Sequence, residues 1–103
     1  MEDLQNDNLE EIIQNNPHVV VQYGATWCGM CKIIKPKLTR IASENPGVKF
    51  VYVDAEKFLS SRSLVDIENL PTIAGFKNGQ LIKSLATTKE EAILEIVNET
   101  ASN

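Results

Sequence analysis

The sequence contains few cysteines and histidines, and this shortage excludes several kinds of small protein. Its 103 residues include two cysteines and one histidine. Two cysteines are too few for the disulfide framework that holds many small secreted domains together. A tetrahedral zinc site needs four ligands, and His18 lies well before the cysteines in the sequence. The one zinc arrangement left is an ion shared by the cysteine pairs of two chains.

Positive charge and long apolar runs are also scarce. The formal net charge is −4, and nucleic acids and anionic membranes repel such a protein. No apolar run approaches the ~18 residues of a membrane span. The first residues, Met1 to Asn6, lack the basic and apolar regions of an export signal. We therefore expect a cytoplasmic protein with no nucleic acid and no membrane as partner.

The length and composition fit one globular domain over residues 1–103. With 43% hydrophobic residues, the chain is long enough to bury a core without a metal or a disulfide. No linker, internal repeat or low-complexity block divides it.

Apolar periodicity predicts alternating helices and strands. Helices are expected over about residues 7–15, 28–44, 57–66 and from Thr88 onward, where Glu91 would complete a capping box. Strands are expected over about residues 18–23, 48–54, 72–77 and 80–85. Asn78-Gly79 favours a type I′ hairpin turn between the last two strands. The order predicts an α/β protein with a mixed sheet and helices on both faces.

Both cysteines lie in one short stretch, Trp27-Cys28-Gly29-Met30-Cys31-Lys32, between a predicted strand and a predicted helix. A disulfide across so short a loop stabilises a fold poorly, because little chain entropy is removed. The start of a helix offers unpaired N–H groups and a partial positive charge, which stabilise a thiolate at Cys28. Cys31 follows one turn later and is expected to be more buried, so it suits a resolving thiol.

This stretch, the helical Pro36 and the later Leu70-Pro71-Thr72 resemble the thioredoxin family over nearly the whole chain. The resemblance implies the thioredoxin fold, three α/β/α layers around a mixed sheet, with a shortened or missing first edge strand. It implies Cys28 as attacking thiol, Cys31 as resolving thiol and Pro71 as a cis-proline. A trans proline that begins a strand is the alternative for Pro71.

The resemblance also implies which residues meet the substrate. Leu70 would offer backbone groups to an extended substrate segment, beside Pro71. Gly29 and Met30 lie inside the motif. Trp27 would face the substrate, pack at the start of the helix, or do both.

The implied activity is that of a thiol–disulfide oxidoreductase that reduces protein disulfides. It needs no metal or organic cofactor. Its partners would be disulfide-containing substrate proteins and a thioredoxin reductase or similar reductant, and we expect a monomer. Two alternatives stay open: a disulfide oxidant or isomerase, and an interaction module with the same fold.

Several positions depart from the family pattern. Met30 replaces the usual proline of the motif, which restores a backbone N–H or simply supplies a good helix former. Gln22 stands where the family usually has a buried aspartate, and Phe50 where a lysine is common, so both members of a buried charge pair are exchanged together. The family's glycine after the hairpin is missing from Leu85-Ala86-Thr87. We therefore expect a differently shaped substrate groove.

Overall fold

The computed structural model describes residues 1–102, which form one five-stranded sheet in the order β1-β3-β2-β4-β5. The strands are β1 (Glu2–Asp3), β2 (His18–Gly24), β3 (Lys49–Asp54), β4 (Thr72–Lys77) and β5 (Gln80–Ala86). β1, β3 and β2 run parallel, whereas β4 is antiparallel to both β2 and β5. The predicted mixed sheet is confirmed, and its first edge strand is present but short.

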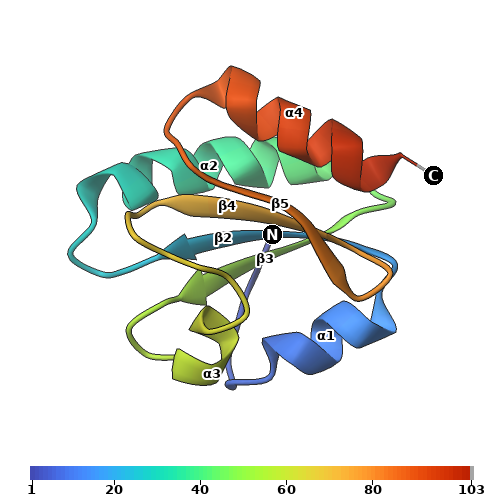
Figure 1. Cartoon of the computed structure of the whole chain (residues 1–103). Coiled ribbons are helices and arrows are strands. Elements are labelled where there is room, and N and C mark those ends of the chain that lie inside the picture. The colour runs from blue at the N-terminus through green and yellow to red at the C-terminus, as the bar shows by residue number, and fades with distance from the viewer. Residues whose placement is uncertain (103) are drawn as a thin grey trace.

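Helices cover both faces of the sheet, as the sequence predicts. They are α1 (Leu9–Asn15), α2 (Gly29–Ser43), α3 (Leu59–Arg62) and α4 (Glu90–Ala101). Figure 1 shows α2 and α4 on one side of the sheet and α1 and α3 on the other. α2 continues through Pro36 without interruption.

β2 lies at the centre of the sheet and contributes side chains to both apolar layers. Val19, Val21 and Tyr23 point toward α1 and α3 and pack in one buried cluster. Val20 points to the opposite face, where it packs with Ile34 and Leu38 among others of the second cluster. The strand therefore has apolar residues on both faces, which explains why its sequence shows almost no alternation.

The third helix is shorter than the predicted 57–66. Asp54 Oδ1 accepts hydrogen bonds from the backbone N–H groups of Glu56 (3.0 Å) and Lys57 (3.1 Å), and this turn holds the chain out of a helix after β3. α3 is consequently a single turn, Leu59–Arg62.

The capping box predicted for the last helix is wrong. Lys89, not Thr88, is the N-cap of α4, and no side chain caps the helix. Thr87 Oγ1 instead accepts a hydrogen bond from the Lys89 N–H at 3.1 Å, so the connection from β5 turns before the helix begins.

Two backbone features agree with the sequence. Asn78 and Gly79 have φ angles of 52° and 83°, the left-handed values that a type I′ turn requires at both positions. The Leu70–Pro71 peptide bond directly before β4 is cis, which confirms the geometry implied by the resemblance.

Candidate active site

The cysteine pair lies at the start of α2, just after the connection from β2. Cys28 is the N-cap residue of the helix, and its own N–H donates to the carbonyl of Ala25 at 3.1 Å. Cys28 and Cys31 are joined as a disulfide, with their Cα atoms 5.3 Å apart. The short connection after Gly24 thus places both sulfurs at the amino end of one helix.

The helix start favours negative charge on Cys28. The backbone N–H of Cys31 donates to Cys28 Sγ at 3.2 Å, and the first turn of α2 contains no acidic residue. Unpaired N–H groups and the helix dipole act in the same direction. Cys31 is 1% exposed and Cys28 5%, so the second cysteine is the more buried one, as predicted.

The loop before β4 reaches the same place. Ala25, Cys28 and Cys31 form a small buried cluster, and Leu70 packs against it. Beside this cluster, a surface groove of about 370 Å³ is lined by Asn69, Leu70, Pro71, Ala86, Thr87, Thr88 and Lys89. The predicted residues Leu70 and Pro71 therefore line a groove, and Leu70 connects this groove to the cysteine cluster.

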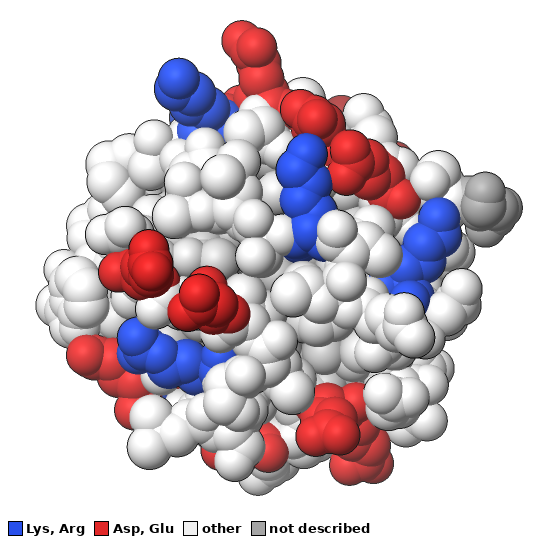
Figure 2. All heavy atoms as spheres, in the orientation of Figure 1, with Lys and Arg blue, Asp and Glu red and all other residues white. Residues whose placement is uncertain are grey.

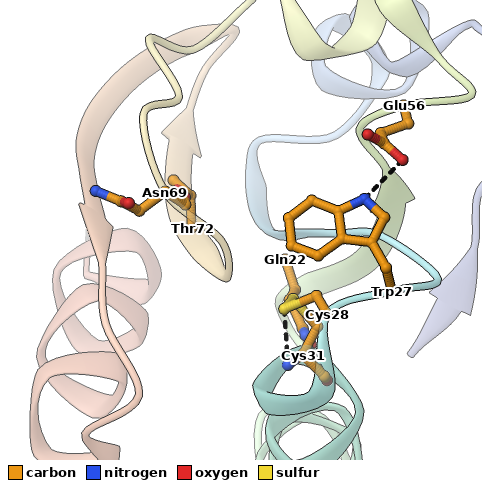
Figure 3. The surroundings of a disulfide bond; sticks show 7 residues. All are labelled: Gln22, Trp27, Cys28, Cys31, Glu56, Asn69 and Thr72. Atoms are coloured by element: carbon orange, nitrogen blue, oxygen red, sulfur yellow. Dashed lines mark hydrogen bonds between the residues drawn. A yellow bond between two sulfur atoms is a disulfide. The ribbon is translucent and has the colours of Figure 1, made fainter.

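Trp27, Gly29 and Met30 form the outer side of the site. Trp27 is 66% exposed and Met30 43%, and Gly29 is the first residue of α2 with open space around its Cα. The indole Nε1–H of Trp27 donates to Glu56 Oε1 at 2.7 Å (Figure 3). The sequence reasoning missed Glu56.

A topological signal for Glu56 was present in the sequence. β2 and β3 are parallel neighbours, and Gly24 at the end of β2 pairs with Asp54 at the end of β3. Residues that follow the two strands therefore meet at one edge of the sheet, which brings Glu56 to Trp27.

The two exchanged positions, Gln22 and Phe50, are both buried on the α2 side of the sheet. Phe50 is 4% exposed and belongs to the apolar cluster beneath α2. Gln22 is 0% exposed, and its Nε2 donates to the carbonyl of Cys31 at 3.0 Å. An amide and an aromatic ring thus occupy the places of the two charges, and neither leaves an unpaired charge in the core.

In residues 1–102, no helix has the length and apolar character needed to cross a bilayer. Over the same residues, no three histidine, cysteine or acidic side chains gather in an arrangement that could hold a metal ion.

Comparison with known proteins identifies the relationship. The family model named Thioredoxin matches residues 1–99. The chain belongs to the thioredoxin family. As a thioredoxin-family protein it is a thiol–disulfide oxidoreductase, and Cys28–Cys31 is its CxxC pair.

The relatives within the thioredoxin family are distant but cover most of the chain. The thioredoxin of Echinococcus granulosus is 35% identical over 95 residues, which are 92% of this chain and 89% of the relative. The mitochondrial thioredoxin-3 of Saccharomyces cerevisiae is 33% identical over 89 residues, 84% of this chain and 70% of the relative.

A solved structure confirms the thioredoxin fold. It comes from work on the structural basis of the thiol resolving mechanism in yeast mitochondrial 1-Cys peroxiredoxin via glutathione/thioredoxin systems. It superposes with a TM-score of 0.87 at 27% identity, covering 96% of this chain and 94% of its own.

Proposed function

We propose that this protein reduces disulfide bonds in other proteins, with Cys28 as the attacking thiol and Cys31 as the resolving thiol. One observation carries the assignment: Cys28 Sγ sits at the amino end of α2 and accepts the Cys31 N–H at 3.2 Å. That position stabilises a thiolate, which is the nucleophilic form. Cys31 lies behind it, one turn further into the helix.

The reaction begins when the Cys28 thiolate attacks one sulfur of the substrate disulfide. A mixed disulfide forms, and the other substrate sulfur leaves as a thiolate that takes up a proton. Cys31, deprotonated, then attacks Cys28 Sγ, which closes the Cys28–Cys31 bond and releases the second substrate thiolate. The substrate gains two electrons and the CxxC pair loses two. A thioredoxin reductase or similar reductant returns them.

The groove beside the pair supports an extended peptide as substrate. A substrate segment would lie along Leu70 and Pro71 and pair with the backbone of Leu70 as an added strand does, since the Pro71 carbonyl already accepts the Thr87 N–H at 3.2 Å. Trp27 and Met30, both exposed, would contact it from the outer side together with Gly29. Leu85-Ala86-Thr87 stands where the family usually has a glycine after the hairpin, and its Ala86 and Thr87 line the groove, which restricts the substrate segments that fit.

The setting of the reaction follows from the same chemistry. We place the protein in the cytoplasm, because a dithiol reductant works where thiols stay reduced. We also propose that it acts as a single domain and a monomer. The CGMC motif serves without a metal or organic cofactor. A peroxiredoxin whose oxidised thiol needs resolving fits as a substrate, because the structurally similar chain comes from work on that process.

A redox titration tests the proposed direction. The protein is equilibrated with defined dithiol buffers, and Trp27, the only tryptophan, reports the state of the pair. We expect a reduction potential at or below the cytosolic glutathione poise of about −220 to −320 mV. A potential well above that range would contradict the reductase function and favour a disulfide oxidant.

A further inference from the structure

Among the buried side-chain nitrogen and oxygen atoms of residues 1–102, one has no hydrogen-bond partner: Oε1 of Gln22. The residue is fully buried, so the surrounding solvent does not reach this oxygen. A buried acceptor without a partner carries its full desolvation cost, and native proteins contain few of them. A functional explanation for the unpaired oxygen of Gln22 is therefore needed.

The position of Gln22 directs its amide at the second cysteine. Along β2, Val20 points to the α2 side and packs with Ile34 and Leu38, and Gln22 is two residues further on the same face. Its Nε2 donates to the Cys31 carbonyl at 3.0 Å, which holds the amide against that residue. Figure 3 shows the Gln22 side chain reaching toward the cysteine pair.

The orientation of the amide follows from the same contact. If the amide were turned over, Oε1 would face the Cys31 carbonyl oxygen, and two acceptors would meet. Oε1 therefore points away from that carbonyl, while the Nε2 bond keeps the amide group itself against Cys31. In the disulfide state the Cys31 sulfur has no hydrogen to offer it.

We propose that Gln22 is a positioning residue whose Oε1 accepts a hydrogen bond from the Cys31 S–H, a donor that exists only after the disulfide is reduced. The inference rests on the proposed function for the dithiol reductant. Reduction adds two electrons to the Cys28–Cys31 bond, and one proton goes to Cys31 Sγ while Cys28 stays a thiolate. The reductant's two thiols supply the electrons, close to a disulfide and give up two protons, one to Cys31 and the other to solvent.

Two consequences follow for the pair. The amide oxygen is unpaired in the disulfide form and paired in the dithiol form, so Gln22 shifts the equilibrium toward the dithiol. Because the bond holds the proton on Cys31, Cys28 is the sulfur that ionises first. A glutamine performs both tasks without a buried charge.

Gln22→Met tests the shift, because methionine has a similar shape and presents no carbonyl acceptor. The proposed dithiol state keeps the Nε2 contact seen in the disulfide state, so its loss in Gln22→Met affects both states equally. In a glutathione redox buffer followed by Trp27 fluorescence, we expect the equilibrium constant to move about tenfold or more toward the disulfide. Phe50→Leu, a buried change in the same layer without a polar atom, is the control and should move it less than about twofold. An equally small change for Gln22→Met would overturn the proposal.

The S–H stretch of Cys31 gives a second readout that a packing role would not move. In a Cys28→Ser background Cys31 is the only thiol, and its infrared S–H band should lie at lower frequency with Gln22 than with Met at position 22. Bands at the same frequency would overturn the proposal.

If the Gln22→Met variants do not fold, an NMR measurement on the wild-type protein tests the proposal. With ¹³C-labelled glutamine, the Cδ resonance of Gln22 should move downfield on reduction, and an unmoved resonance would overturn the proposal. None of these measurements uses a protein substrate, so their failure is distinct from failure of the proposed function.

Discussion

The indole of Trp27 is two-thirds exposed, yet one hydrogen bond sets its direction. Its Nε1–H donates to the Glu56 carboxylate at 2.7 Å, and the ring stands beside Cys28 in Figure 3. A charged acceptor makes a stronger bond than a neutral one. Glu56, which follows β3, therefore fixes the orientation of Trp27, which follows β2.

Replacing Glu56 with alanine should free the ring without unfolding the protein. We expect a stability change within about 0.5 kcal/mol, since the contact is exposed. The time-resolved fluorescence anisotropy of Trp27 should decay faster, and the KM for a protein disulfide should rise a few-fold. Glu56→Gln keeps an acceptor and is the control. Unchanged anisotropy in Glu56→Ala would contradict this role.

A glycine next to the site has a packing reason. A Cβ built on Gly24 would overlap the hydroxyl and ring of Tyr52, whose face carries the Lys35 ammonium 4.2 Å from the ring centre. Gly24 thus leaves room for the aromatic ring that covers the end of β2.

Gly24→Ala should lower the free energy of unfolding by about 1–3 kcal/mol, as overpacking does. Urea denaturation of the single variants and of Gly24→Ala combined with Tyr52→Leu measures the coupling. We expect the double variant to lose clearly less than the sum of the two single losses. Additive losses would show that the two residues do not compete for space.

At the level of elements, α3 receives its cap from a distant part of the chain. The Asp7 carboxylate accepts hydrogen bonds from the N–H groups of Ser60 (3.0 Å) and Ser61 (2.7 Å) and from the Ser61 hydroxyl (2.7 Å). The Ser61 hydroxyl oxygen accepts the N–H of Leu9 at 3.2 Å. One carboxylate therefore ties the segment before α1 to the start of α3.

These bonds make stability depend on pH in the acidic range. The Ser61 side-chain hydrogen bond, with the backbone N–H groups of Ser60 and Ser61, lowers the pKa of Asp7 below its usual 3.8, and desolvation only partly opposes this. A depressed pKa in the folded state stabilises the fold above the unfolded pKa, and this contribution is lost as pH falls through the folded value.

Asp7→Asn should therefore destabilise the protein at pH 7, and the difference should shrink as the pH falls below 3.8 through the lowered folded-state pKa of Asp7. Urea unfolding of both proteins across this range measures the difference. A gap between them that is the same at pH 7 and at pH 3 would contradict the ionic role of Asp7.

The elements also show where sequence patterns suffice. The positions of β2 to β5 follow from runs of β-branched residues and the Asn78-Gly79 turn, and they agree within one residue, whereas β1 was expected only from the resemblance, as a shortened or missing strand. The extent of α3 and the start of α4 depend on Asp54, Asp7 and Thr87, whose side chains bond to backbone groups outside the helical pattern. Local periodicity contains no information about those partners.

The same division holds for the site. The cysteines, Trp27 and the cis Leu70–Pro71 bond were reached from a short motif and a resemblance. Glu56 and the unpaired oxygen of Gln22 were not, because each depends on two segments that meet only after folding.

Across the whole molecule, exposed ion pairs join elements that the core already holds together. Arg40 Nη2 of α2 lies 2.6 Å from Glu90 Oε1 of α4, and Lys35 Nζ lies 2.7 Å from Asp3 Oδ1 of β1. The face in Figure 2 shows basic and acidic side chains interspersed, with the basic ones apart from one another. Such pairs are screened by salt and contribute little stability each.

A double-mutant cycle on Arg40→Met and Glu90→Gln should give a coupling energy of about 0.2–1 kcal/mol at low salt. In about 1 M NaCl, where the screening length is about 3 Å, the coupling should nearly vanish. Denaturant unfolding of the four proteins at both salt concentrations measures it. A coupling that persists unchanged in high salt would indicate a pair protected from solvent.

The order of attack by the two cysteines is the central feature of the proposed chemistry, and trapping tests it directly. Each single variant, Cys31→Ser and Cys28→Ser, is incubated with an oxidised protein substrate and analysed by peptide mass spectrometry. Cys31→Ser should accumulate a mixed disulfide through Cys28, because the resolving thiol is missing. Cys28→Ser should form little, because Cys31, at 1% exposed, is more buried than Cys28 at 5%. A mixed disulfide that forms mainly through Cys31 would contradict the assignment.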